Sequence, residues 1–105
     1  MAQAKVDSGI CGFHTRIEAA LLDDGQTVRV TLQSSCEAVC NLAEHFPELN
    51  AFREISFRGD GPQTLRLAAQ YLKHPACPVP AGIIKAVEVA ASLALPKDAA
   101  IKVSR

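Results

Sequence analysis

The chain has 105 residues, of which 49% are apolar, and its eleven Lys and Arg residues balance eleven Asp and Glu residues. This length predicts one domain over residues 1–105. Zero net charge disfavours a nucleic-acid binder, which needs a basic face, and the apolar fraction argues against a disordered chain. No apolar run could span a bilayer, and residues 1–7 lack the apolar core of a signal peptide. We therefore expect a cytoplasmic protein with reduced thiols that engages neither membrane nor nucleic acid.

Two segments of alternating apolar and polar residues predict a β-hairpin. Residues 13–21 alternate in this way, and residues 28–32 repeat the pattern. Asp24-Gly25 between them is a turn signal, since glycine readily adopts the positive φ that a tight hairpin needs. No pattern precedes Gly12, so we expect the first strand to begin after it.

Three helices are predicted from apolar residues at helical spacing. The first follows a capping-box pattern, Ser34-x-x-Glu37, and ends before Pro47. The second follows Pro62. The third covers residues 80–95 and has a single thin polar stripe, which predicts that most of its surface is buried.

Two weaker patterns suggest further strands. Residues 54–58 alternate over a short stretch, and residues 99–103 could form a last strand that pairs with the hairpin. The order of elements predicts an α+β two-layer sandwich. In it, an N-terminal antiparallel hairpin and a short C-terminal strand pack against three helices.

Cysteines provide the main chemical signal. No Cys-x-x-Cys pair occurs, so zinc-ribbon and thioredoxin patterns are absent. Cys36 lies in the first turn of a predicted helix and Cys77 precedes another. The partial positive charge of a helix N-terminus stabilises a thiolate, which is the form that ligates metals. Cys11 lies beside Gly12 at the entry to the first strand.

These positions predict a metal site. The start of one hairpin strand lies beside the end of the other, so Cys11 and Cys36 are expected to be close. If Cys77 joins them, the three thiolates could hold zinc or an iron–sulfur cluster, with Cys40 or His74 as a fourth ligand. For Cys40 we favour a buried packing role, because free cysteine is among the most buried residue types.

The arrangement of motifs resembles the U-type iron–sulfur cluster assembly scaffolds. The shared features are Cys11-Gly12, the Asp24-Gly25 hairpin, Cys36 at a helix start, and a His74-containing segment with Cys77 before an Ala-rich helix. The resemblance implies a non-catalytic scaffold whose three cysteines bind zinc or a nascent cluster.

A second resemblance rests on two short motifs. Cys11-Gly12-Phe13 and the segment from His74 to Pro80, His-Pro-Ala-Cys-Pro-Val-Pro, are similar to an uncharacterised small domain family of anaerobic prokaryotes. This resemblance implies no particular activity.

Two other classes of function stay open. The chain could be a structural or protein-interaction module that can form a homodimer, with buried inert cysteines and an apolar docking patch formed by Phe52, Phe57 and Pro78-Val79-Pro80. A cysteine-nucleophile enzyme is less expected. Cys77 with His74 is the only local pair of nucleophile and base, and no third group orients it.

Overall fold

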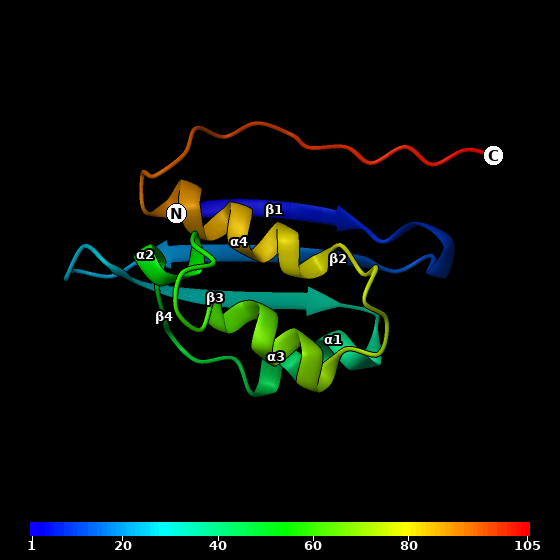
Figure 1. The fold of residues 1–105 in the computed structure, drawn as a ribbon, viewed down its shortest axis with the longest axis horizontal. Helices are drawn as coiled ribbons and strands as arrows, with labels where there is room; N and C mark the ends of the chain where they lie inside the picture. Colours follow the sequence, from blue (N-terminus) through cyan, green and yellow to red (C-terminus); the bar gives the residue numbers. More distant parts are fainter.

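The computed structural model describes residues 1–105 and shows a four-stranded antiparallel sheet in the order β1-β2-β3-β4, with its main helices against one face (Figure 1). The predicted α+β class, with a hairpin packed on helices, is confirmed. The elements are β1 (Ala2–Asp7), a 3₁₀ turn η1 (Gly9–Cys11), β2 (His14–Leu21), β3 (Thr27–Ser34), α1 (Glu37–Glu44), β4 (Leu49–Asn50), α2 (Ala51–Glu54), α3 (Gln63–Tyr71) and α4 (Val79–Ala90).

The hairpin forms from β2 and β3, as predicted. Ile17 pairs with Leu32 and Ala19 pairs with Val30. In β2, Thr15, Ile17 and Ala19 are buried beneath the helices, whereas the intervening side chains lie on the opposite face of the sheet. The period-2 pattern therefore fixed both the strands and the face that each presents to the core.

Strand β1 contradicts the prediction that the first strand begins after Gly12. All six residues of β1 pair with β2, from Ala2 opposite Ala19 to Asp7 opposite His14. The inward-facing side chains of β1 are small, and so they produce only a weak apolar alternation in the sequence. Pairing with β2 stabilises a strand that its own sequence barely specifies.

Helix α4 lies across β1 and β2 and supplies much of the core. Its buried residues are Val79, Pro80, Ile83, Ala86 and Val87. At Gly82 the helix approaches the sheet so closely that an added Cβ would lie 2.5 Å from Val6 Cγ2 and 3.1 Å from Ile17 Cδ1. The helix ends at Ala90 rather than near the predicted Leu95, and Ser92 beyond it adopts a positive φ of 60°.

The predicted capping box at the start of α1 is not formed. Ser34 is the last residue of β3, and its hydroxyl accepts hydrogen bonds from the Thr15 hydroxyl (2.9 Å) and the Cys36 backbone N–H (3.1 Å). Cys36 is the residue at the N-cap of α1, with no side-chain cap. Sheet pairing at Thr15 thus keeps Ser34 extended and moves the helix start two residues along the chain.

The strand suggested at residues 54–58 is also wrong. Residues 51–54 form α2, and the chain continues as a loop to Pro62. Glu54 is fully buried, and its carboxylate accepts the N–H groups of Gln63 and Thr64 (both 2.9 Å) and the Thr64 hydroxyl (2.5 Å). It thereby caps the first turn of α3, where unpaired donors and the helix dipole both favour a negative group.

The C-terminal segment forms no strand. Residues 91–105 contain no helix or strand, and residues 97–105 are exposed along a segment that leaves the body of the protein (Figure 1). The prediction that residues 99–103 form a strand paired with the hairpin of the same chain is therefore wrong. As a result, β1 is an edge strand of the sheet.

Replacing Gly82 by Ala should destabilise the protein by about 1–2 kcal/mol. Ala is the better helix former, but the added methyl overlaps a stiff β-branched side chain, and overpacking of this kind outweighs the gain in propensity. Chemical denaturation of Gly82→Ala alone and in a Val6→Ala background measures the effect. The penalty should shrink in the second background, and a Gly82→Ala protein as stable as wild type would contradict the close packing.

The Asp24 carboxylate should make the hairpin turn sensitive to acid. Hydrogen bonds from the Thr27 hydroxyl and the N–H groups of Gln26 and Thr27 lower its pKa below the ordinary 3.8. A lowered folded-state pKa gives stability that is present above the unfolded pKa and is lost as pH falls through the folded one. Asp24→Ala should lower the urea midpoint at neutral pH, and the difference from wild type should narrow at about pH 3.

The neighbouring Asp23→Ala variant is the matched control, because Asp23 is exposed and makes no hydrogen bond through its side chain. It should follow wild type at both pH values. A constant difference between Asp24→Ala and wild type across this pH range would show that the carboxylate charge does not contribute.

Candidate functional site

The sheet register places the segments that carry Cys11 and Cys36 at the same end of the sheet. Cys11 closes the turn η1 in the β1–β2 connection, and Cys36 follows the end of β3. Thr15, at the start of β2, pairs with Ser34, the last residue of β3. Both cysteine-bearing segments therefore leave the sheet together.

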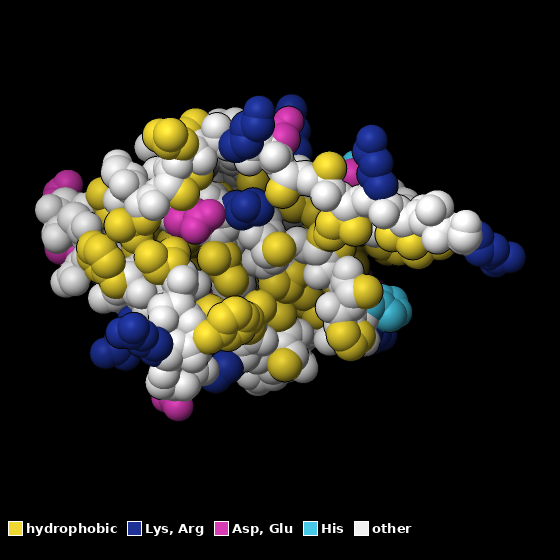
Figure 2. Space-filling model, turned by 45° about the horizontal axis from the view of Figure 1, so that its top comes forward, with side chains coloured by type: hydrophobic (Ala, Val, Ile, Leu, Met, Phe, Trp, Pro, Cys, Tyr) yellow, Lys and Arg dark blue, Asp and Glu magenta, His cyan; other side chains and the backbone are white.

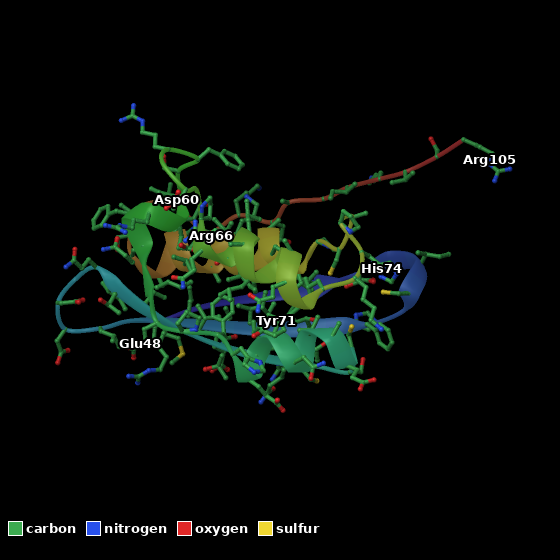
Figure 3. The ribbon with its side chains drawn as sticks, turned by 60° about the horizontal axis from the view of Figure 1, so that its bottom comes forward. Glu48, Asp60, Arg66, Tyr71, His74 and Arg105 are labelled. Atoms are coloured by element: carbon green, nitrogen blue, oxygen red, sulfur yellow. The ribbon has the colours of Figure 1, made fainter.

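Cys77 reaches this end through α4. The contact of Gly82 with Val6 places the first turns of α4 over the last residues of β1, and Cys77 lies in the α3–α4 connection just before the helix. Figures 1 and 3 show this connection, with the labelled His74, at the end of the sheet where β1 and β3 finish. We call residues 8–13, 34–40 and 73–78 the cysteine end.

The four cysteines are free thiols with different accessibility. Cys11 and Cys40 are exposed, whereas Cys36 and Cys77 are half-buried and pack against the core. The Cys40 thiol donates a hydrogen bond to the Ser34 carbonyl oxygen at 3.2 Å. The buried packing role favoured for Cys40 is therefore wrong, because its place on α1 points it towards the surface.

The structure brings cysteine-bearing segments together but does not assemble a ligand set. No group of three or more His, Cys, Asp or Glu side chains lies close enough to hold a metal ion. The thiols share one end of the sheet without being within coordination distance as a trio.

A cysteine–histidine catalytic pair is not formed either. The hydrogen bond between Cys77 and His74 joins backbone atoms, with the Cys77 N–H donating to the His74 carbonyl oxygen at 3.1 Å. No hydrogen bond connects the Cys77 thiol with the His74 imidazole. His45 caps the end of α1 and stacks on Tyr71 with ring centroids 4.7 Å apart, which is a structural role.

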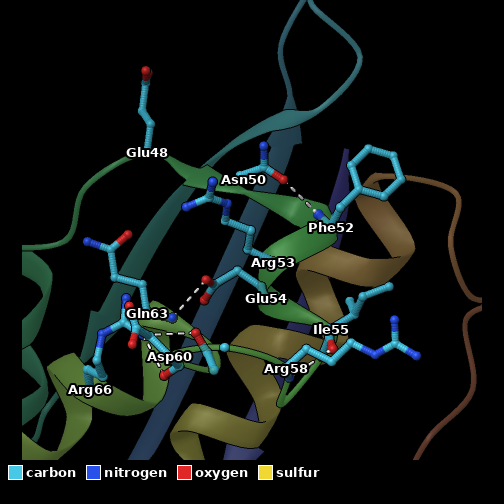
Figure 4. Close-up of a pocket in the computed structure, with 13 residues that line it drawn as sticks. Glu48, Asn50, Phe52, Arg53, Glu54, Ile55, Arg58, Asp60, Gln63 and Arg66 are labelled. Carbon is cyan, nitrogen blue, oxygen red and sulfur yellow. Dashed lines mark hydrogen bonds between the residues drawn. The ribbon is translucent and has the colours of Figure 1, made fainter.

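An open depression of about 850 Å³ lies at the opposite end of the sheet, and the sequence patterns did not indicate it (Figure 4). It is lined mainly by polar residues from β4, α2 and the loop before α3. Many of its charges have partners within the protein. Arg66 donates to the carbonyl oxygens of Asp60 (2.7 Å) and Gly61 (2.8 Å), Glu48 pairs with Arg29 (2.6 Å), and Glu54 caps α3. These bonds stabilise the loop before α3.

The expected apolar docking patch is not formed. Phe52 and Phe57 are exposed, as predicted, but Val79 and Pro80 are buried in the core. Phe52 lies on α2, at the other end of the sheet from the start of α4 (Figure 1). The two parts of the expected patch are thus separated by the length of the sheet.

Comparison with known proteins supplies a family but no function. The model of a family of unknown function (DUF6951) matches residues 2–103. No curated protein and no solved structure matches the chain. None of the helices has the length and apolar character needed to cross a membrane.

The accessibilities predict two classes of thiol reactivity. In the native reduced protein, Cys11 and Cys40 should react with a thiol reagent faster than Cys36 and Cys77, since the reagent reaches exposed sulfur without local opening. Stopped-flow labelling should show a fast and a slow phase of equal amplitude. Cys11→Ser/Cys40→Ser should lose the fast phase, and one uniform rate for four thiols would contradict the assignment.

Proposed function

The chain belongs to DUF6951, a family of unknown function, and we propose that it is a non-catalytic metal-binding protein whose ligands are thiolates of the cysteine end. The ligands are Cys11, Cys36 and Cys77, with Cys40 or His74 as the fourth. One observation carries the proposal: three segments far apart in the sequence each bring a free thiol to one end of the sheet.

The chemistry of these donors fits a soft or borderline metal. Thiolates with one further thiolate or imidazole match the ligand sets of zinc and of iron–sulfur clusters, and carboxylate-preferring ions do not select such groups. When bound, the ion or cluster would be coordinated by the protein and would not take part in a catalysed reaction. The protein's own residues would position it without turnover, for storage, transfer or stabilisation of the fold.

Binding requires local closure, because the side chains do not form a ready-made group. Cys36 is the fixed ligand of the proposal, held at the N-cap of α1 by its N–H bond to Ser34. Cys11 lies in a turn bounded by Gly9 and Gly12, both at positive φ, and Cys77 lies in an irregular connection. In the proposal these two segments move towards Cys36.

The N-terminus of α1 favours a metal site that includes the Cys36 thiolate. The first N–H groups of α1 carry partial positive charge, which stabilises a thiolate placed at the cap. Because ligands must be deprotonated, affinity should rise with pH. A cysteine-nucleophile enzyme is disfavoured, since no base contacts a thiol in this region.

Protein purified without oxygen should contain zinc or iron at one site per chain, and Cys36→Ser should abolish binding. The variant removes the fixed ligand towards which the segments of Cys11 and Cys77 move in the proposal. Elemental analysis and the ultraviolet–visible spectrum measure content and metal type. His14→Ala is the matched control, because His14 is exposed near the same end and is not a proposed ligand.

The fourth ligand is identified by comparing Cys40→Ser with His74→Ala. The variant that removes a true ligand should weaken zinc binding at least about tenfold in a chelator competition, whereas the other should match wild type. Metal-free wild-type protein after anaerobic reconstitution, or full metal content in Cys36→Ser, would overturn the proposal.

A further inference from the structure

We propose that residues 99–103 pair as a β-strand with the open edge of β1 in a second copy of the chain, so that two copies exchange C-terminal segments. This inference goes beyond the metal site and uses none of its residues. It rests on two unpartnered elements, an edge strand and an extended apolar segment, that every copy of the chain carries.

The first element is the outer edge of β1. The strand pairs on one side with β2, and no strand lies on its other side. Helix α4 covers one face of β1 but is not hydrogen-bonded to its edge as a strand would be. Such an edge presents a row of backbone N–H and C=O groups that favours the addition of another strand.

The second element is the C-terminal segment. Ile101 is 81% exposed and Val103 is 90% exposed, and the apolar pair is separated by the polar Lys102. Figure 2 shows the segment projecting from the body with apolar side chains along it. Its alternation is that of a half-buried strand, yet within one chain nothing covers its apolar side. The family match extends to residue 103 and so includes this segment.

The two elements have matching faces. In β1, Ala4 and Val6 are half-buried and pack against the core beneath α4, while Lys5 faces the open side of the sheet. A parallel strand paired to this edge, with Ala99 beside Ala4 and Ile101 beside Val6 on the α4 side, would extend the core over these residues. Its other side would join the solvated face of the sheet.

The charges on the solvated faces are complementary. On this face β1 carries Lys5 and Asp7, and the C-terminal segment carries Ala100 and Lys102. In the parallel register that sets Ile101 beside Val6, Lys102 lies beside Asp7 and Ala100 lies beside Lys5, so no like charges are opposed. Cross-strand pairs of opposite charge stabilise a sheet modestly and select its register.

A second copy is the occupant that the geometry favours. The segment leaves α4 through Ser92, at φ 60°, and runs past its own β1 without pairing with it (Figure 1). Because each copy carries both the edge and the strand, exchange satisfies both copies at once and closes under two-fold symmetry. The connection between α4 and the segment is residues 91–98, which contain no helix or strand.

Light scattering and sedimentation of the full chain, kept reduced and with a chelator present, test the proposal. Wild type should be a dimer, and Ile101→Asp should raise the dimer dissociation constant about a hundredfold, since each dimer would bury two isoleucines. Ala100→Asp, on the solvated side of the same segment, is the matched control and should stay dimeric. Both variants should keep a folded core, with the same thermal unfolding transition at a concentration where wild type is monomeric, because these side chains are exposed in the single chain.

Hydrogen exchange distinguishes exchange between copies from pairing within one copy. The amides of residues 99–103 should be protected in wild type and unprotected in Ile101→Asp. A monomeric wild type, a dimer unaffected by Ile101→Asp, or protected amides in a monomer would each overturn the proposal.

Discussion

The close approach of α4 to the sheet at Gly82 is the constraint on which the rest of the molecule depends. With no Cβ at that position, the helix packs directly on Val6 and Ile17. This contact decides where α4 begins, and therefore brings the preceding connection and Cys77 to the end of the sheet that already carries Cys11 and Cys36. The outer edge of β1 has no neighbouring strand, because the C-terminal segment forms none beside it.

The two ends of the sheet differ in how their polar groups are used. At the end near α2, ion pairs and caps within the protein occupy many of the charged side chains, and Glu54 is committed to α3. At the cysteine end the four thiols are free, and the α3–α4 connection that carries Cys77 contains no helix or strand. The proposed metal site draws on these thiols, none of which takes part in an ion pair or a helix cap within the protein.

Local preference and tertiary structure disagree at the C-terminus. Residues 99–103 have the alternation of a strand, but one copy of the chain offers no pairing in the observed arrangement. The proposed exchange resolves this disagreement by supplying the edge from another copy. It would join two cores along β1 while leaving the cysteine end of each copy as it is in the single chain.

The sequence by itself determined the α+β class, the β2–β3 hairpin with its buried face, and the approximate place of the three main helices, because these follow from periodicity and turn chemistry over short stretches. Only the tertiary structure decided that residues 2–7 form β1, that Cys36 caps α1, that Cys40 is exposed and that Glu54 caps α3. Three of these depend on a partner distant in the sequence: β2 for the weak strand, Thr15 for the Ser34–Cys36 turn, and α3 for the buried carboxylate. Periodicity carries no information about such partners. The sequence therefore indicated that the cysteines could lie at one end of the sheet, but it could not give the distances between their thiols.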